Sequence, residues 1–244
     1  MMLMRKSDLI KFLSGREITY SFLGRVFERE VDRRLLENLI SRKEMLLRYK
    51  SLNDPNAITI KEGFEELSKY LSTLDEGRMN ETVLELAADY ANLFLGVKYA
   101  FFGKGIPHPS ESAYTDGHLY GDVIDRVFEA YLEGNLVKSP NFHEPEDHIA
   151  LELYFMAHLC RKAITSLNNE IYQDLLKYLN MQKDFLSEHL LRWAPRLADD
   201  IIKNANTLFY KAIGKILKGF LSIEEKIIDE VIEQMKTMFS EKLS

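Results

Sequence analysis

Residues that break helices gather in one stretch of this chain, and most of the remaining sequence repeats apolar residues at helical spacing. Six of the 12 glycines and four of the 6 prolines lie between residues 96 and 145. Elsewhere apolar side chains recur every three or four residues, as they do along the buried face of a helix. We find no β-strand pattern longer than four residues. The sequence therefore predicts an all-α fold.

The pattern favours a single domain over residues 1–244, built as a bundle of about ten helices around one long irregular loop. That loop, residues 96–117, is a candidate hinge between an N-terminal bundle and the rest. Loops on a rigid helical scaffold carry function more often than other parts of a chain, so we look for the functional site there.

Helix boundaries follow from proline and from polar starting residues. Pro145 is expected to begin a long helix, because proline lacks an N–H that the first turn does not need. Asn168 is expected to begin the next helix, and Pro195 to interrupt the pattern. Residues 201–221 and 223–239 are then expected to form the last two helices.

Charge and cysteine content exclude several classes of protein. The net charge of −6 argues against a nucleic-acid-binding protein, which needs a basic face to neutralise phosphates. No apolar run approaches the roughly 18 residues of a membrane-spanning helix, so we expect no stable membrane insertion. The single cysteine, Cys160, has no partner for an internal disulfide, which fits a reducing compartment. A cytoplasmic protein is expected.

The block Glu144-Pro145-Glu146-Asp147-His148 has two interpretations. As a helix start it is well made, because carboxylates near the positive end of the helix dipole contribute roughly 0.3–1 kcal/mol each. That interpretation leaves His148 unexplained, since a cation is unfavourable at this end. Alternatively, Asp147 and His148 present an acceptor and a switchable donor at the mouth of a groove. Nearby aromatic residues could form either core or the lining of such a groove, namely Tyr90, Phe94, Tyr99, Phe101, Phe102 and Tyr114.

An enzyme or metalloprotein is the alternative from a different class. His148 and Glu152 stand one helical turn apart, and His143 and His108 could approach them from the loops as further ligands. Such spacing arises by chance in any histidine-bearing helix, and no second Glu-x-x-His pair faces it. No nucleophile elbow or phosphate-binding loop is present. We therefore predict no catalytic residues, no metal and no cofactor, with the alternative left open.

Four blocks of sequence carry a resemblance to a known family. They are Tyr90-Ala91-Asn92-Leu93-Phe94-Leu95-Gly96, Pro109-Ser110-Glu111-Ser112-Ala113-Tyr114, the block from Glu144 through Leu159, and Phe185, His189-Leu190, Trp193 and Pro195. In this order they resemble the TorD/DmsD family of redox-enzyme maturation chaperones, with nitrate reductase chaperones as more distant relatives. One departure is Ser110, which stands where the family usually has Tyr or Trp. A second is the last helix, beyond Leu221, which matches no part of the family pattern.

The resemblance implies an all-helical cytoplasmic chaperone that is not an enzyme, sometimes found as a domain-swapped homodimer. Its relatives bind the twin-arginine signal peptide of a precursor of a molybdopterin-containing oxidoreductase. They delay export until the cofactor has been inserted. The identity of the client is not specified by the sequence. Some relatives are associated with guanine nucleotide, but no motif here locates a site for it.

Residue roles are carried over by position within the matching blocks. The residues expected to contact the signal peptide are Leu93, Phe94, Pro109, Asp147 and His148. Those expected to support the groove are Tyr90, Glu111, Ser112, Tyr114, Glu144 and Pro145. The two guanidiniums of the peptide suit Asp147, Glu144 and Glu146, because arginine pairs with carboxylates through two donors at once.

Overall fold

The computed structural model describes residues 5–43, 57–95 and 107–243, with side chains described as far as residue 237. These residues form helices and no β-strand, which confirms the all-α prediction. Along the chain the α-helices are α1 (Lys6–Glu28), α2 (Arg33–Ser41), α4 (Ile58–Ser72), α5 (Met79–Tyr90), α6 (Glu111–Thr115), α7 (Val123–Glu133), α8 (Ile149–Asn168), α9 (Tyr172–Phe185), α10 (Leu191–Asn204) and α11 (Leu208–Leu243). Three short turns join some of them: the 3₁₀ turn η3 (Glu76–Arg78) and the π-helical turns η4 (Ala91–Leu95) and η6 (Leu186–Leu190).

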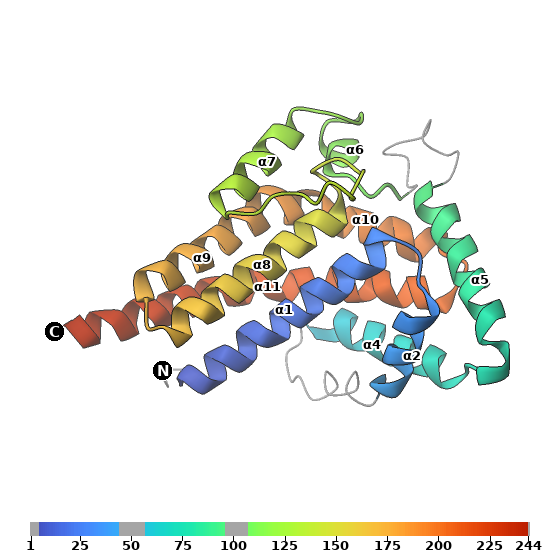
Figure 1. Cartoon of the computed structure of the whole chain (residues 1–244), viewed down its shortest axis with the longest axis horizontal. Coiled ribbons are helices and arrows are strands. Elements are labelled where there is room, and N and C mark those ends of the chain that lie inside the picture. Colours follow the sequence, from blue (N-terminus) through green and yellow to red (C-terminus); the bar gives the residue numbers. More distant parts are fainter. Residues whose placement is uncertain (1–4, 44–56, 96–106, 244) are drawn as a thin grey trace.

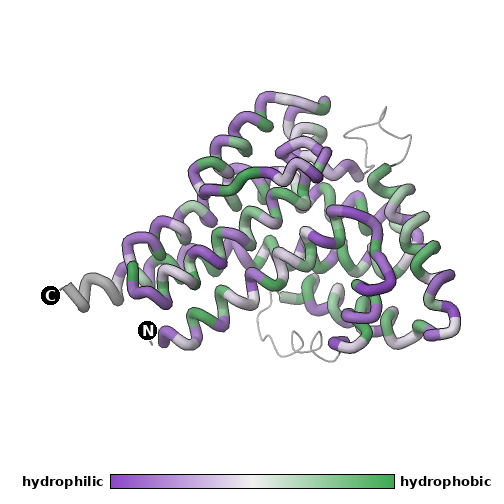
Figure 2. The backbone as a smooth tube through the Cα atoms, viewed as in Figure 1, coloured by the Kyte–Doolittle hydropathy of each residue, from purple (hydrophilic) through white to green (hydrophobic). Residues whose placement is uncertain are grey.

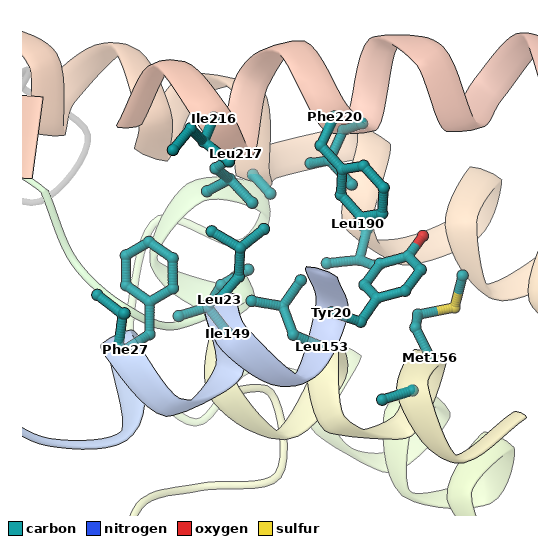
Figure 3. Packing of buried hydrophobic residues seen from close by; sticks show 14 of the residues in the cluster. Tyr20, Leu23, Phe27, Ile149, Leu153, Met156, Leu190, Ile216, Leu217 and Phe220 are labelled. Atoms are coloured by element: carbon teal, nitrogen blue, oxygen red, sulfur yellow. The ribbon is translucent and has the colours of Figure 1, made fainter. Parts of the chain in front are cut away.

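Helix α8 lies at the centre of the bundle. It packs along α1 on one side and α9 on the other, while α11 packs along α4 and α10 (Figure 1). The close-up in Figure 3 shows apolar side chains of α1, α8 and α11 meeting, among them Leu23, Leu153 and Leu217. All three are fully buried. Figure 2 shows hydrophilic and hydrophobic residues alternating along the helices, as expected for amphipathic helices around a shared core.

Glycine allows α4 and α11 to approach closely. A Cβ atom on Gly219 of α11 would lie 2.8 Å from the backbone Cα of Ile60, and one on Gly63 of α4 would lie 2.8 Å from the backbone nitrogen of Ile216. Neither neighbour is a flexible side-chain end that could move aside. Any larger residue would therefore force these two helices apart.

A buried ion pair joins the two ends of the chain. The Arg16 guanidinium on α1 donates from Nε and Nη2 to the Glu224 carboxylate on α11, with the Nη2–Oε2 distance at 2.6 Å. The Tyr20 hydroxyl donates to the same carboxylate at 2.6 Å. Both charged side chains are almost fully buried. Because removing one partner would leave an unpaired charge in the core, this contact fixes how α11 docks on α1.

Several predicted boundaries need correction. Helix α8 begins at Ile149 and not at Pro145, because His148 has an extended backbone and pairs with Ser110. It runs through Asn168, the residue expected to begin the next helix. Pro195 lies inside α10, where burial of Trp193 and Leu197 outweighs the one hydrogen bond that proline removes.

The C-terminal helices also differ from the prediction. Residue 201 lies near the end of α10, and α11 continues through residue 223 without a break. The buried residues Ile228, Val231, Ile232 and Met235 extend its apolar face, and α11 packs against α9. Burial of this stripe explains why the helix continues.

Residues 96–106, which include half of the candidate hinge and the aromatic residues Tyr99, Phe101 and Phe102, lie outside the described residues. The division of residues 1–244 into one domain, and the hinge at 96–117, stay predictions. Within the part of the chain that the structure describes, no helix combines the length and hydropathy needed to cross a bilayer.

Candidate functional site

The segment before α6 and the segment before α8 lie side by side, although more than 30 residues separate them in sequence. Ser110 and His148 form an isolated antiparallel β-bridge. The Glu111 N–H donates to the Asp147 carbonyl at 2.9 Å, and the Ile149 N–H donates to the Pro109 carbonyl at 2.8 Å. Two of the four sequence blocks singled out above therefore form one structural unit.

Asp147 holds this unit together from inside. Its Oδ2 accepts a hydrogen bond from the Ser112 backbone N–H at 2.8 Å, and the side chain is fully buried. Burial raises the pKa of the Asp147 carboxyl, and the hydrogen bonds from Ser112 partly oppose that shift. Asp147 was expected to contact an arginine of the peptide, but its side chain has no exposed surface in this conformation. Its hydrogen bond to Ser112 instead supports the backbone of the unit.

His148 is the N-cap of α8. Its Nδ1 accepts a hydrogen bond from the Ala150 N–H at 3.1 Å, so the ring satisfies one of the free donors at the helix start. Burial, with a smaller contribution from the neighbouring His108, lowers the pKa of His148 to about 3. The ring is therefore neutral at physiological pH. A donor that switches its charge at physiological pH finds no support in this geometry, because burial disfavours the charged form of the ring.

A cleft of about 200 Å³ opens beside this unit, and we call it the α1–α5 cleft. It is lined by Glu28, Arg29, Glu30, Tyr90, Phe94, Leu95, His108, Pro109, Glu144 and His148. Five of these were expected from the sequence, either as peptide contacts or as supports: Tyr90, Phe94, Pro109, Glu144 and His148. Leu93 is buried in the core and is not among the lining residues.

The other five lining residues were not predicted as site residues. Glu28 ends α1, and Arg29 and Glu30 follow it. They lie some 60 residues before Tyr90, and only the tertiary packing brings them to the cleft. Leu95 ends the π-helical turn η4 and is 53% exposed. Its position beside Phe94 could have suggested it, since both belong to the same sequence block.

The cleft has an apolar wall and an acidic edge. Phe94, Leu95 and Pro109 supply apolar surface, and the Tyr90 hydroxyl is directed away, donating to the Phe27 carbonyl at 2.9 Å. Glu144 and Glu30 are exposed, while Glu28 accepts a hydrogen bond from the Tyr154 hydroxyl at 2.9 Å. Three carboxylates against one guanidinium, Arg29, leave the edge net negative. Such a surface suits an apolar segment with positive charge beside it.

The remaining supporting residues link the unit to α10 and η6. The Tyr114 hydroxyl donates to Asp200 Oδ2 at 2.9 Å, and its ring lies 5.6 Å from that of Trp193. The Pro145 carbonyl accepts from the His148 N–H at 3.2 Å.

Glu146, expected to meet a guanidinium of the peptide, already pairs with Lys138 at 2.7 Å. Of the three carboxylates expected to meet the arginines, only Glu144 is exposed without a salt bridge among the described residues.

Beneath the unit lies a buried polar cluster. Glu111 Oε2 is 2.8 Å from His189 Nδ1, and the Trp193 indole donates to Glu152 Oε2 at 3.1 Å. Glu111 and Glu152 are both fully buried. Burial raises the pKa of Glu152 well above its usual value, and Glu111 raises it further. The block Phe185 to Pro195 thus acts structurally, by supplying partners to acids buried beneath α6 and α8.

The metal-site alternative receives no support from the geometry. His143 is exposed, whereas Glu152 is buried and bonded to Trp193. Within residues 5–43, 57–95 and 107–243, no group of three His, Cys, Asp or Glu side chains is arranged to hold a metal ion. The predicted set of His143, His148 and Glu152 is therefore not brought together.

Comparison with known proteins identifies the family. The sequence profile described as the nitrate reductase delta subunit matches residues 56–199, more than half of the chain. The chain therefore belongs to this family, which is the TorD/DmsD family of chaperones that the sequence blocks resemble.

Individual relatives agree. The protein named chaperone protein TorD from Vibrio cholerae O395 is 34% identical over 152 residues, which cover 62% of this chain and 66% of the relative. The chain thus matches slightly less than two thirds of that relative. The chaperone protein TorD of Aliivibrio salmonicida is 27% identical over 226 residues, covering 91% of this chain and 98% of the relative. The relatives are named as chaperones, which agrees with the prediction that this chain is not an enzyme.

Proposed function

We propose that this protein is a cytoplasmic chaperone for the maturation of a redox enzyme, acting as one helical domain over residues 1–244. It binds the twin-arginine signal peptide of a precursor of a molybdopterin-containing oxidoreductase. It keeps that precursor from export until its cofactor has been inserted. The observation that carries the proposal is the α1–α5 cleft, whose apolar wall and acidic edge match a peptide with an apolar stretch and positive charge.

The apolar stretch of the peptide packs on Phe94, Leu95 and Pro109. Leu95 is half exposed beside side chains that are almost fully buried, so a peptide that covers it removes apolar area from water at little structural cost. The neutral imidazole ring of His148 lies in the same wall. It contributes shape and apolar surface to the contact and no charge.

The acidic edge steers the peptide and sets its direction. Glu28, Glu30 and Glu144 create a negative potential that falls off over about 8–10 Å at physiological salt. The net charge of −6 adds a longer-range attraction for a cationic partner. Binding should therefore weaken as salt is added.

A direct test measures peptide binding by fluorescence anisotropy. The probe is a labelled synthetic peptide that has two adjacent arginines followed by an apolar stretch. Leu95→Asp should weaken binding at least tenfold, because it places a charge on the apolar wall. The matched control is Leu84→Asp, since Leu84 is another exposed leucine from the same part of the chain and is not among the cleft residues. Equal loss in both variants, or in neither, would rule out the α1–α5 cleft as the peptide site.

The client is then identified by capture. The full chain is used as bait in its host's cytoplasm, and retained proteins are identified by mass spectrometry. An uncleaved precursor with a twin-arginine signal, retained by the wild type and by Leu84→Asp and lost with Leu95→Asp, supports the proposal and names the client. Homodimer formation, the other predicted association, is measured on the same samples by light scattering.

A further inference from the structure

A second cleft lies between α7 and α9, and we call it the α7–α9 cleft. It has a volume of about 290 Å³. Helix α7 stands above α9 at the edge of the bundle (Figure 1). Phe155 of α8 also lines the cleft. The lining residues are Arg126, Glu129, Ala130, Glu133, Phe155, Met181, Asp184, Phe185, Glu188 and His189. Two of its apolar side chains, Phe155 and Phe185, are almost fully buried.

Four carboxylates face one another across this cleft. Glu129 and Glu133 come from α7, and Asp184 and Glu188 come from α9 and the turn that follows it. Within each pair the residues are four positions apart, which places them about 6 Å apart along the helix axis. We call this arrangement the carboxylate ladder. It consists of two acids on α7, one acid on α9 and one on η6.

The ladder is not neutralised by the protein itself. All four carboxylates are exposed, and none of them forms a salt bridge with another residue in the described part of the chain. Arg126 is the one basic side chain among the described residues that line the cleft. Like charges placed this close repel one another, so a cation between them is favourable.

A mostly buried polar side chain also lines the cleft. His189 lines it and is only 4% exposed. Its Nδ1 is occupied by Glu111 at 2.8 Å, while its Nε2 has no hydrogen-bond partner among the described residues. The cleft thus combines an apolar floor, an unused ring nitrogen and an excess of acid. That combination fits a side chain with an apolar stem and a cationic, hydrogen-bonding head, which describes arginine.

We propose that the carboxylate ladder binds the arginine pair of the client's signal peptide, while the α1–α5 cleft holds the apolar stretch. This inference rests on the proposed function. It answers a difficulty in the sequence-based assignment, because Asp147 is buried and Glu146 is taken by Lys138. Two guanidiniums can pair with the four acids of the ladder, and each can donate to acids on both sides of the cleft.

The two clefts lie at two points along the same helix. His148, the N-cap of α8, lines the α1–α5 cleft, and Phe155 of α8 lines the α7–α9 cleft. These residues are seven positions apart, which corresponds to about 10 Å along the helix axis. About three residues of extended chain cover that distance. A signal peptide whose arginine pair adjoins its apolar stretch has the length to engage both.

The test compares two variants that lose the same number of charges. The ladder variant is Glu129→Gln, Glu133→Gln, Asp184→Asn and Glu188→Gln. The control variant replaces four exposed acids outside both clefts, as Glu76→Gln, Glu85→Gln, Glu225→Gln and Glu230→Gln. Each is titrated with the arginine-pair peptide and with the same peptide in which glutamine replaces both arginines. Circular dichroism and urea unfolding confirm that both variants are folded.

The ladder variant should bind the arginine peptide about tenfold more weakly than the control variant does, which corresponds to about 1.4 kcal/mol. The glutamine peptide should bind the two variants equally. If both variants bind the arginine peptide equally, the ladder is not the arginine site. That result does not contradict the α1–α5 cleft as the site of the apolar stretch. If the glutamine peptide binds Leu95→Asp as tightly as the wild type, the α1–α5 cleft is not the site of the apolar stretch. If the arginine peptide does not bind the wild type at all, both proposals fail.

A second measurement locates the arginines without relying on affinity. A nitroxide label is attached beside the arginine pair, and broadening of backbone amide signals is followed by NMR. Signals of α7 and α9 should broaden most. Strongest broadening at the end of α1 and the start of η4 would place the arginines at the α1–α5 cleft and overturn the inference.

Discussion

Glu111 and His189 meet at 2.8 Å in the interior of the protein, although 78 residues separate them in the chain. Glu111 begins the short helix α6, and His189 lies in the π-helical turn η6 before α10. The same His189 ring lines the α7–α9 cleft, whereas Glu111 adjoins the segment that carries Pro109 and the α1–α5 cleft. One hydrogen bond therefore connects the supports of both proposed peptide sites.

Removing this contact should destabilise the fold. In Glu111→Ala the buried His189 nitrogen loses its partner, and an unsatisfied buried polar group costs about 1–3 kcal/mol. Glu111→Gln keeps an oxygen at the same place and should lose less. Urea denaturation of both variants gives the comparison. The contact is unimportant for stability if Ala and Gln unfold at the same urea concentration as the wild type.

Asp147 and Glu144 should behave differently in peptide binding. Asp147→Asn retains an oxygen that accepts from the Ser112 N–H, and its side chain lies away from the surface. Peptide affinity should therefore change less than twofold. Glu144→Gln removes an exposed charge at the cleft edge, and it should lower affinity roughly twofold to fivefold, within the range for exposed charges. It should also reduce the salt dependence. A large loss in Asp147→Asn with a normal urea midpoint would mean that the peptide opens this region to reach the acid.

Much of the fold was predictable from residue periodicity, and the errors have a common cause. The helix after Pro145 was expected at the proline, but the backbone bridge between Ser110 and His148 keeps that stretch extended. Similarly, Pro195 alone predicts a helix break, whereas burial of its neighbours keeps α10 continuous. In each case a contact with a distant segment outweighs a local preference, and no single window of sequence contains both partners.

The site was predictable only where the recognised sequence blocks supply it. Tyr90, Phe94, Pro109, Glu144 and His148 come from three of those blocks, and they line one cleft. Burial could not be inferred in the same way, so Asp147 was placed at the surface. The carboxylate ladder was missed because Glu129 and Glu133 are ordinary exposed residues of an amphipathic helix. They become distinctive only when α9 places Asp184 opposite them.

His148 should make the protein less stable in acid. Its pKa is lowered from 6.5 to about 3 on folding, so the unfolded chain takes up a proton first as the pH falls. The stability that the neutral ring contributes is complete above pH 6.5 and is lost progressively toward pH 3. His108, whose pKa burial lowers to about 4, acts in the same direction.

The test uses His148→Asn, because asparagine is a good N-cap residue and does not titrate. Between pH 7 and pH 4.5 the wild type should lose about 2–3 kcal/mol more unfolding free energy than the variant. Urea unfolding at each pH measures both. Parallel stability curves for the two proteins would show that His148 is not kept neutral by the fold. Peptide affinity of the wild type between pH 6 and 8 should stay constant as far as this ring is concerned.

The close packing of α4 on α11 predicts opposite effects for two glycine replacements. In Gly219→Ala the new methyl group meets the backbone of Ile60, and helix separation should cost about 1–3 kcal/mol. In Gly15→Ala nothing lies within 4 Å of the added atom, and Gly15 is an exposed residue within α1. Alanine there should stabilise the protein by about 0.5–1 kcal/mol, because glycine is the poorer helix former. Thermal or urea unfolding distinguishes the two. A Gly219→Ala protein as stable as the wild type would mean that α4 and α11 can separate freely, which would contradict the tight packing on which the position of α11 depends.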